Sequence, residues 1–336
     1  MRRDYFFDRW SLIASRRNSR GHDVAGAEAS AGVTPGRWSE ACDFCPGNED
    51  RTPPSLLEFG GADPHAPAGG SSWRLRVFRN RFPILPGDAD AAAAEAAAAP
   101  PLYRVRPSRG GHEVVVESAR HDLTPGSFST AEWADAFRAY RARIAALEAE
   151  PGTAWVEVFK NQGALAGASR EHSHSQIVAL PLVPAPMKVK CRQTAAAECG
   201  FCRVVASEMA GPRMVAVNDH FVAFCPFAPQ WENEVWILAL RHVARLDALG
   251  EAAGRSLARM VRDVASAVEQ LTPCYNLMLF SGPPGRDFHL HLEIAPHSSG
   301  AVKAGFELAT GFSVLRISPE ESAARYRSLI SGTGPN

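Results

Sequence analysis

The 336-residue sequence predicts an α+β fold built from two similar halves. Each half contains, in the same order, a Cys-x-x-Cys pair, a strand that ends near a histidine, an amphipathic helix, another strand and a His-x-His pair. The recurring pairs are Cys42/Cys45 and Cys199/Cys202 for the thiols, and His172/His174 and His289/His291 for the imidazoles. Because an accident would have to place the same motifs in the same succession twice, we interpret the chain as an internal repeat. We expect the two halves to span 1–185 and 186–336.

The amino-acid composition and the net charge limit the classes of function that this protein can have. Hydrophobic residues make up 46% of the chain, and Lys+Arg and Asp+Glu both total 36, so the formal net charge is zero. This balance gives no sign of a nucleic-acid partner or a membrane surface, and any phosphate recognition must be local. No apolar run approaches the length of a membrane span, and the first residues lack the apolar core of a signal peptide. We therefore expect a cytoplasmic protein.

The first 40 residues carry a cluster of arginines, Arg16, Arg17 and Arg20. The guanidinium group matches phosphate oxygens, so this cluster can form a phosphate clamp. Exposed arginines are common on protein surfaces, and a flexible basic arm is the simpler interpretation. The residues themselves leave both interpretations open.

Strands are predicted by alternation and by β-branched runs. In the first half, 73–78, 112–118 and 154–159 have such patterns, and His121 lies just beyond the second of them. In the second half the corresponding runs are 234–239, 275–280 and 287–293, and His242 follows the first of these. The two halves therefore repeat both their strands and the histidine at a strand end.

The clearest elements are two helices. The first is predicted over 129–150, where Ser129 and Glu132 form a capping box. The second is predicted over 250–271, in the same position within its repeat. Each has one apolar face, which we assign to the core. These faces consist of Trp133, Phe137, Tyr140, Ile144 and Leu147, and of Leu257, Val261, Val264 and Val268.

The Cys-x-x-Cys pairs favour metal binding. The chain has seven cysteines and no export signal, which argues against a disulfide framework, and a redox motif would need a single such pair. Two thiolates and two imidazoles are a tetrahedral zinc set, with no position left open, so the sites are expected to be structural. Iron in the second site stays possible. The expected ligands are Cys42, Cys45, His121 and His172 in one site, and Cys199, Cys202, His242 and His289 in the other.

Three other histidines compete for these positions, namely His112, His220 and His297. His112 precedes its strand, and its counterpart in the second half is Asn233. The repeat therefore favours His121 as the ligand.

The second histidine of each His-x-His pair remains unmetallated. Residues two apart in a strand share a face, so His172 can bind the metal while His174 faces a substrate. A neutral imidazole is a good nucleophile at phosphorus, and Gln176, Ser169 and Asn161 can donate hydrogen bonds to phosphoryl oxygens. His291 has no comparable amide after it, and we interpret it as a decayed copy with a packing or substrate-contact role.

The ordered motifs resemble those of the galactose-1-phosphate uridylyltransferase family, in the histidine triad superfamily. The matching segments are RRDYFFDRWSLIASRRNSR, CDFC, VFRNRFPIL, EVVVESARH, FKNQGALAGASREHSHSQ, APQWENEVWILALRH, FHLHLEIAP and KAGFELATGFSVLRISPEE. The resemblance implies two histidine-triad half-barrels, each an antiparallel sheet with flanking helices, usually in a homodimer. It also implies ping-pong transfer of a nucleotide through His174, with Gln176 as its catalytic partner. Arg17 and Arg20 match the family's paired arginines, and Asn80, within VFRNRFPIL, is expected to bind substrate.

One departure from the family concerns specificity. The uridylyltransferase signature is His-Pro-His-Gly-Gln, whereas Ser173 and Ser175 replace Pro and Gly here, which looks more like the ADP-sugar phosphorylase branch. The first hypothesis is transfer of UMP from UDP-glucose to a hexose 1-phosphate. The second is a phosphorylase that uses inorganic phosphate as acceptor. The third is a non-catalytic protein that binds zinc or nucleotide.

Overall fold

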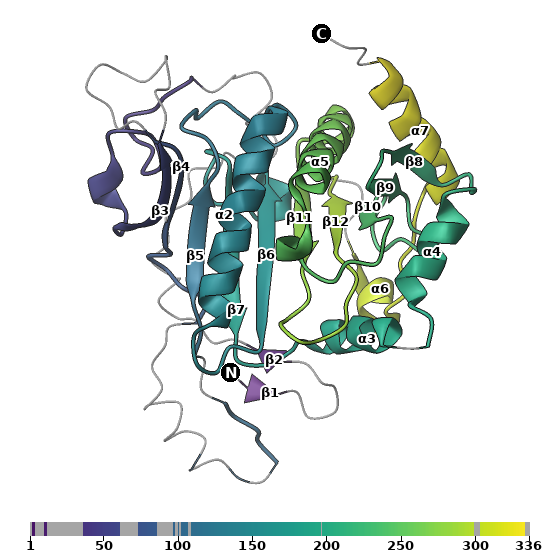
Figure 1. The fold of residues 1–336 in the computed structure, drawn as a ribbon, viewed down its shortest axis with the longest axis horizontal. Coiled ribbons are helices and arrows are strands. Elements are labelled where there is room, and N and C mark those ends of the chain that lie inside the picture. Colours follow the sequence, from purple (N-terminus) through teal and green to yellow (C-terminus); the bar gives the residue numbers. More distant parts are fainter. Residues whose placement is uncertain are drawn as a thin grey trace.

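The computed structural model describes residues 2–3, 10–11, 36–60, 73–85, 97, 100, 102–106, 109–195, 197–298 and 303–332 (Figure 1). The strands are β1 (Arg2–Arg3), β2 (Trp10–Ser11), β3 (Ser55–Gly60), β4 (Trp73–Arg79), β5 (His112–Val116), β6 (Trp155–Gln162), β7 (His174–Leu180), β8 (Met214–Val217), β9 (Phe221–Phe224), β10 (Val235–Ala239), β11 (Tyr275–Phe280) and β12 (His291–Pro296). The α-helices are α2 (Thr130–Glu148), α3 (Ala185–Thr194), α4 (Gly200–Glu208), α5 (Glu251–Leu271), α6 (Gly305–Thr310) and α7 (Pro319–Gly332). Short 3₁₀ turns are η2 (Glu49–Arg51), η3 (Ala164–Ala166) and η4 (Leu246–Ala248).

Ten of the described strands form one sheet in the order β3-β4-β5-β7-β6-β11-β12-β10-β9-β8. All the strand pairs in this sheet are antiparallel. Read outward from the central β6–β11 pair, the strands of both halves follow the same succession, which agrees with the repeated sequence pattern. The α+β class and the antiparallel sheet are thus confirmed. The two sets of strands join into one continuous sheet, and the division at 185 stays a prediction.

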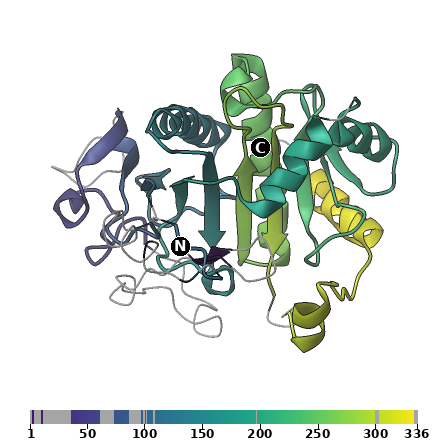
Figure 2. The same ribbon diagram turned by 90° about the horizontal axis from the view of Figure 1, so that it is seen from below.

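Helices α2 and α5 cover one face of this sheet. The capping box starts α2 as expected, because Glu132 N–H donates to Ser129 Oγ and Ser129 N–H donates to the Glu132 carboxylate. The apolar faces of both helices are buried in a single core with sheet residues such as Ile177 and Leu277. Figure 2 shows α2 and α5 on one side of the molecule and α6 on the opposite side.

The other face of the sheet carries the histidines. In β7, Ile177 and Ala179 join the helix-covered core, so His174 and Gln176, one residue out of phase, point to the opposite face. On this second face, α3 packs Met187 in a cluster with Phe280 of β11. The alternation of β7 therefore separates a packing face from a face that is available for chemistry.

The hydropathy of the helices bears on membrane insertion. Among the described residues, no helix combines the length and the apolar character needed to span a bilayer.

Leu277 tests the continuity of the core at the centre of the sheet. It is 2% exposed on β11, between β6 and β12, so Leu277→Ala leaves a cavity and should lower the free energy of unfolding by about 2–5 kcal/mol. The control Leu102→Ala, at a position 64% exposed, should change it by less than about 0.5 kcal/mol. Urea unfolding measures both, and equal effects would contradict a shared core at this strand.

Candidate metal clusters and nucleophile site

The structure brings the first predicted ligand set together. Cys42, Cys45, His121 and His172 are all buried, and their ligand atoms lie within 4.8 Å of one another. Cys45 Sγ lies 3.5 Å from His121 Nδ1 and 3.6 Å from His172 Nδ1, and Cys42 Sγ lies 3.6 Å from the same His172 nitrogen. Usual zinc–sulfur and zinc–nitrogen bond lengths give a tetrahedral S–N edge of about 3.6 Å. The donor set therefore fits a tetrahedral metal ion.

The second predicted set is also together, in a more exposed position. Cys199, Cys202, His242 and His289 have their ligand atoms within 4.8 Å of one another. Cys202 Sγ lies 3.4 Å from His242 Nδ1 and 3.7 Å from His289 Nδ1, and Cys199 Sγ lies 3.8 Å from His289 Nδ1. This chain therefore has two Cys/His clusters that could hold a metal. Among the described residues, neither cluster includes the competing histidines His112, His220 and His297.

A backbone carbonyl orients one buried ligand imidazole in each cluster. His172 Nε2–H donates to the carbonyl oxygen of Ser118 at 2.8 Å, and His289 Nε2–H donates to that of Ala239 at 2.9 Å. A proton on Nε2 leaves Nδ1 free as the ligand atom in each ring, which is the usual support for a metal-binding histidine. His242 has a carboxylate in this role instead, since its Nε2 lies 2.7 Å from Asp287 Oδ1.

His174 has the other tautomer, with its proton on Nδ1. Its Nδ1–H donates to the carbonyl oxygen of His172 at 2.9 Å, so the lone pair lies on Nε2. The side chain is buried, and burial, together with the nearby charge of Lys160, lowers the pKa of His174 to about 4. The imidazole is therefore neutral, with a fixed tautomer.

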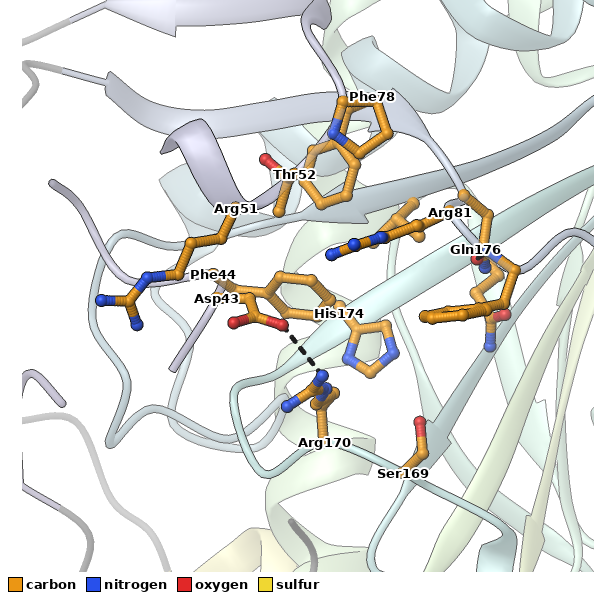
Figure 3. A pocket seen from close by; sticks show the side chains of 14 residues that line it. Asp43, Phe44, Arg51, Thr52, Phe78, Arg81, Ser169, Arg170, His174 and Gln176 are labelled. Atoms are coloured by element: carbon orange, nitrogen blue, oxygen red, sulfur yellow. Dashed lines mark hydrogen bonds and ion pairs between the residues drawn. The ribbon is translucent and has the colours of Figure 1, made fainter. Parts of the chain in front are cut away.

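His174 borders a cavity of about 140 Å³ on the open face of the sheet (Figure 3). Gln176, Ser169 and Asn80, three of the predicted substrate-binding or catalytic residues, also line it. The other lining residues are Asp43, Phe44, Arg51, Thr52, Pro53, Phe78, Arg81, Phe82, Val114 and Arg170. The structure therefore brings the predicted nucleophile and three of the predicted donors to one cavity.

Three other predicted substrate-binding residues are not placed at this cavity. Asn161 lies on β6, where its Oδ1 accepts a hydrogen bond from Asn276 Nδ2 at 2.9 Å, and it is not among the lining residues of the cavity. Arg17 and Arg20 lie outside the described residues.

Cationic and aromatic groups that the motifs did not predict also line this cavity. Arg170 and Arg81 bring positive charge to it, and Arg170 Nη2 lies 2.9 Å from Asp43 Oδ2 (Figure 3). Both arginines directly adjoin motif residues, Ser169 and Asn80, and that adjacency was the available signal. Phosphate oxygens are the natural partners of such guanidinium groups.

Phe44 connects the first cluster to the cavity. It lies between the thiols Cys42 and Cys45 in the chain, and its ring is edge-on to His174 with centroids 5.2 Å apart. The same ring lies 6.3 Å from the ring of His172 and 5.6 Å from that of Phe78. The fold of the Cys-x-x-Cys turn thus positions one wall of the cavity.

The second His-x-His pair has a different environment. His291 Nδ1–H donates to the His289 carbonyl oxygen at 2.6 Å, as in the first half, but its Nε2 lies 2.9 Å from Lys190 Nζ. Lys190 also forms an ion pair with Glu293 at 2.5 Å. The nitrogen that is available in His174 is therefore already hydrogen-bonded in His291.

A buried polar network lies beneath His174, on the helix side of the sheet. Lys160 Nζ forms an ion pair with Glu117 Oε2 at 2.9 Å, and both side chains are almost fully buried. Glu117 Oε1 accepts hydrogen bonds from Tyr140, at 2.8 Å, and from Ser175. Ser175, one of the two serines that depart from the uridylyltransferase signature, is thus part of the support beneath the site.

Comparisons with known proteins find the same relatives that the sequence motifs indicate. Residues 70–184 match the family model described as galactose-1-phosphate uridyl transferase, N-terminal domain. The ADP-glucose phosphorylase of Arabidopsis thaliana is 28% identical over 98% of this chain and 92% of its own length. The galactose-1-phosphate uridylyltransferase of Thermotoga maritima is 27% identical over 75% of this chain and 84% of its own length.

Solved structures agree with these relatives. A uridylyltransferase structure is 27% identical and superposes with a TM-score of 0.77 over 99% of both chains. An ADP-glucose phosphorylase from Arabidopsis thaliana with bound ADP-glucose is 28% identical and superposes with a TM-score of 0.72 over 87% of this chain and 91% of that one. In fold and in motifs, this α+β chain is similar to proteins of the uridylyltransferase type. Within that class, the resemblance to galactose-1-phosphate uridylyltransferases is confirmed, with ADP-glucose phosphorylase as a further relative.

The ion pair beneath His174 should matter for stability. Lys160→Met removes the cation and leaves the Glu117 carboxylate buried without it, so the free energy of unfolding should fall by about 3–5 kcal/mol. Arg255→Met, which breaks an exposed pair with Glu251, should cost less than about 1 kcal/mol. Urea unfolding compares the two variants. A loss for Lys160→Met no larger than that of the control would contradict the role given to this pair.

Proposed function

We propose that this chain is a nucleotidyltransferase that takes a nucleoside monophosphate from a nucleotide sugar and carries it on His174. The observation that supports this most directly is the fixed tautomer of His174, which leaves the Nε2 lone pair at a cavity lined by Gln176 and Ser169. A buried nucleophile with a free lone pair beside several hydrogen-bond donors suits attack at phosphorus.

The reaction would proceed in two displacements. In the first, His174 Nε2 attacks the α-phosphorus, an N–P bond forms, and the P–O bond to the sugar phosphate breaks. The sugar 1-phosphate then leaves with the electron pair of that bond. In the second, a phosphate oxygen of the acceptor attacks the same phosphorus and the N–P bond breaks. The His172 carbonyl, which accepts from Nδ1–H, would stabilise the positive charge on the ring while the adduct exists.

The donors at the cavity would act on the phosphoryl oxygens. The amide of Gln176 and the hydroxyl of Ser169 can donate hydrogen bonds as charge builds up on those oxygens. Arg81 and Arg170 line the same cavity and can attract the negatively charged diphosphate. Asn161, Arg17 and Arg20 remain predicted substrate contacts.

Two acceptors are candidates. Hexose 1-phosphate, with UDP-glucose as donor, is favoured by the superposition on a uridylyltransferase over 99% of both chains. Inorganic phosphate is favoured by Ser173 and Ser175 in the His-Ser-His-Ser-Gln signature and by the match to ADP-glucose phosphorylase over 98% of this chain. Both acceptors present a phosphate oxygen to the adduct.

We also propose zinc as the ion of both clusters, because paired thiolates and imidazoles at tetrahedral spacing suit it best. Four protein ligands leave no open position, so bound zinc would stabilise the Cys-x-x-Cys turns and the adjacent strands. Iron stays the alternative for the second cluster.

We also propose a homodimer, because the family that the sequence resembles usually forms one. The apolar side chains of Phe306, Leu308, Phe312 and Val314 are all more than half exposed, and a second copy of the chain would cover such a surface. A cytoplasmic location stays a prediction.

Covalent adduct formation tests the carrier. Incubation with UDP-glucose or ADP-glucose alone should release glucose 1-phosphate and add one nucleoside monophosphate to the intact mass of the protein. His174→Asn should abolish the adduct, whereas His291→Asn should retain it, because His291 Nε2 is hydrogen-bonded to Lys190. A wild-type protein that binds nucleotide without forming an adduct would support the non-catalytic alternative.

Competition between acceptors tests the type of transfer. The isolated adduct should be discharged by inorganic phosphate to a nucleoside diphosphate if the protein is a phosphorylase, and by galactose 1-phosphate to a nucleotide sugar if it is a hexose-1-phosphate uridylyltransferase. Rates of discharge, followed by chromatography of the products, decide between them. Discharge by water alone, with neither acceptor accelerating it, would contradict both assignments.

Metal analysis tests the clusters. The purified protein should contain close to two zinc ions per chain, one for each cluster, and Cys42→Ser and Cys199→Ser should each remove about one. Cys225→Ser is the matched control, since Cys225 is buried but lies in neither cluster. Retention of the full zinc content in Cys42→Ser would contradict the first site. Iron in place of one zinc would support iron as the ion of the second cluster.

A further inference from the structure

Gln176 can assist a phosphoryl transfer only in one orientation. Its amide has a carbonyl oxygen at one position and an NH₂ group at the other, and only the NH₂ group can donate to a phosphoryl oxygen. The wrong orientation would present a carbonyl oxygen to a negatively charged group. An interaction that fixes this amide would therefore be part of the site.

His112 makes such an interaction. It is the first residue of β5 and is 5% exposed, on the same face of the sheet as Gln176. Its Nε2 lies 3.0 Å from Gln176 Oε1, and its Nδ1 accepts the backbone N–H of Ile84 at 3.1 Å. A buried imidazole thus lies between a main-chain donor and the catalytic amide.

The tautomer follows from these partners. A backbone N–H is always a donor, so Nδ1 of His112 must carry the lone pair and Nε2 must carry the proton. Asn80 Nδ2 also lies 3.1 Å from His112 Nε2. The orientation of the Asn80 amide is set by its Oδ1, which accepts from Phe82 N–H at 2.8 Å. The group of Asn80 that faces the ring is therefore the amide nitrogen, which cannot accept the proton on Nε2. The proton on Nε2 is therefore donated to Gln176 Oε1, which leaves the Gln176 NH₂ group on the other side of the amide.

The surroundings of His112 are rigid. Its carbonyl oxygen accepts from Asn80 N–H at 2.8 Å, and the preceding carbonyl, of Gly111, accepts from Ala179 N–H at 2.9 Å. These bonds connect the start of β5 to the end of β4 on one side and to β7 on the other. The main chain at His112 is thus held from both neighbouring strands, which gives its ring a fixed base from which to orient another side chain.

From this geometry we propose that His112 is a positioning residue, which directs the NH₂ group of Gln176 toward the transferred phosphoryl group. The proposal rests on the proposed function, because it assigns His112 a role in the same transfer. It gives a role to a histidine that the sequence motifs offered only as a competing metal ligand. His112 acts through Gln176 and touches no reacting atom itself.

The test is a double-mutant cycle read by single-turnover formation of the His174 adduct with ADP-glucose and with UDP-glucose. His112→Met and His112→Gln have side chains of similar size, but only Gln can accept from Ile84 N–H and also donate to Gln176 Oε1. Both are made in the wild-type and in the Gln176→Met backgrounds. Thermal unfolding of each variant identifies any that is not folded.

We expect His112→Met to slow adduct formation by about tenfold or more and Gln176→Met by about 10²-fold. His112→Gln should recover most of the wild-type rate, and His112→Met should cause no further loss when Gln176 is already absent. The inference is overturned if His112→Met reacts at the wild-type rate, if the Gln and Met variants lose equally, or if His112→Met has its full effect in the Gln176→Met background.

The same measurements separate this inference from the proposed function. If the wild-type protein forms the adduct and the cycle is additive, the transfer through His174 stands and only the role of His112 is wrong. If the wild-type protein forms no adduct with either nucleotide sugar, the proposed function fails, and the inference fails with it.

Discussion

The site depends on one peptide unit, that of His172. Its side chain belongs to the first Cys/His cluster, where Nε2–H donates to the Ser118 carbonyl oxygen at 2.8 Å. Its own carbonyl accepts from His174 Nδ1–H at 2.9 Å. A single residue therefore contributes to the candidate metal cluster through its side chain and sets the tautomer of the His174 imidazole through its backbone. Any displacement of this strand end would disturb both.

The second half of the chain supplies an internal comparison. It repeats the same two hydrogen bonds, from His289 Nε2 to Ala239 and from His291 Nδ1 to His289. The difference lies in the surroundings of the two rings, since His291 Nε2 lies 2.9 Å from Lys190 Nζ, whereas His174 borders a cavity. The backbone arrangement is thus common to both halves, and the side chain that meets Nε2 determines what each imidazole can do.

Local sequence patterns predicted much of this structure, for identifiable reasons. The capping box of Ser129 and Glu132 and the apolar faces of α2 and α5 are short-range signals, and both helices are where the periodicity places them. The repeat made the metal-cluster prediction possible, because it chose His121 over His112. These signals depend on residues close in sequence or on a pattern that occurs twice.

The remaining features depend on contacts between distant segments. Lys190 reaches His291 across 101 residues, and nothing in the pattern around α3 indicates that partner. Asn276 Nδ2 donates a hydrogen bond to Asn161 Oδ1, 115 residues away in the sequence, and a local pattern cannot reveal this contact. The continuity of the sheet through β6 and β11 likewise depends on strand pairing between the halves.

Phe44 has a consequence for how the cavity would respond to an ion held by the first Cys/His cluster. The ring that forms a wall of the cavity belongs to the turn between the two candidate thiol ligands, and its centroid lies 5.2 Å from that of the His174 ring. If the ion were withdrawn, the turn would relax and the cleft would lose that wall while the sheet below kept its own packing. If the first cluster holds an ion, a chelator would therefore inhibit substrate binding, although that ion would touch no reacting atom.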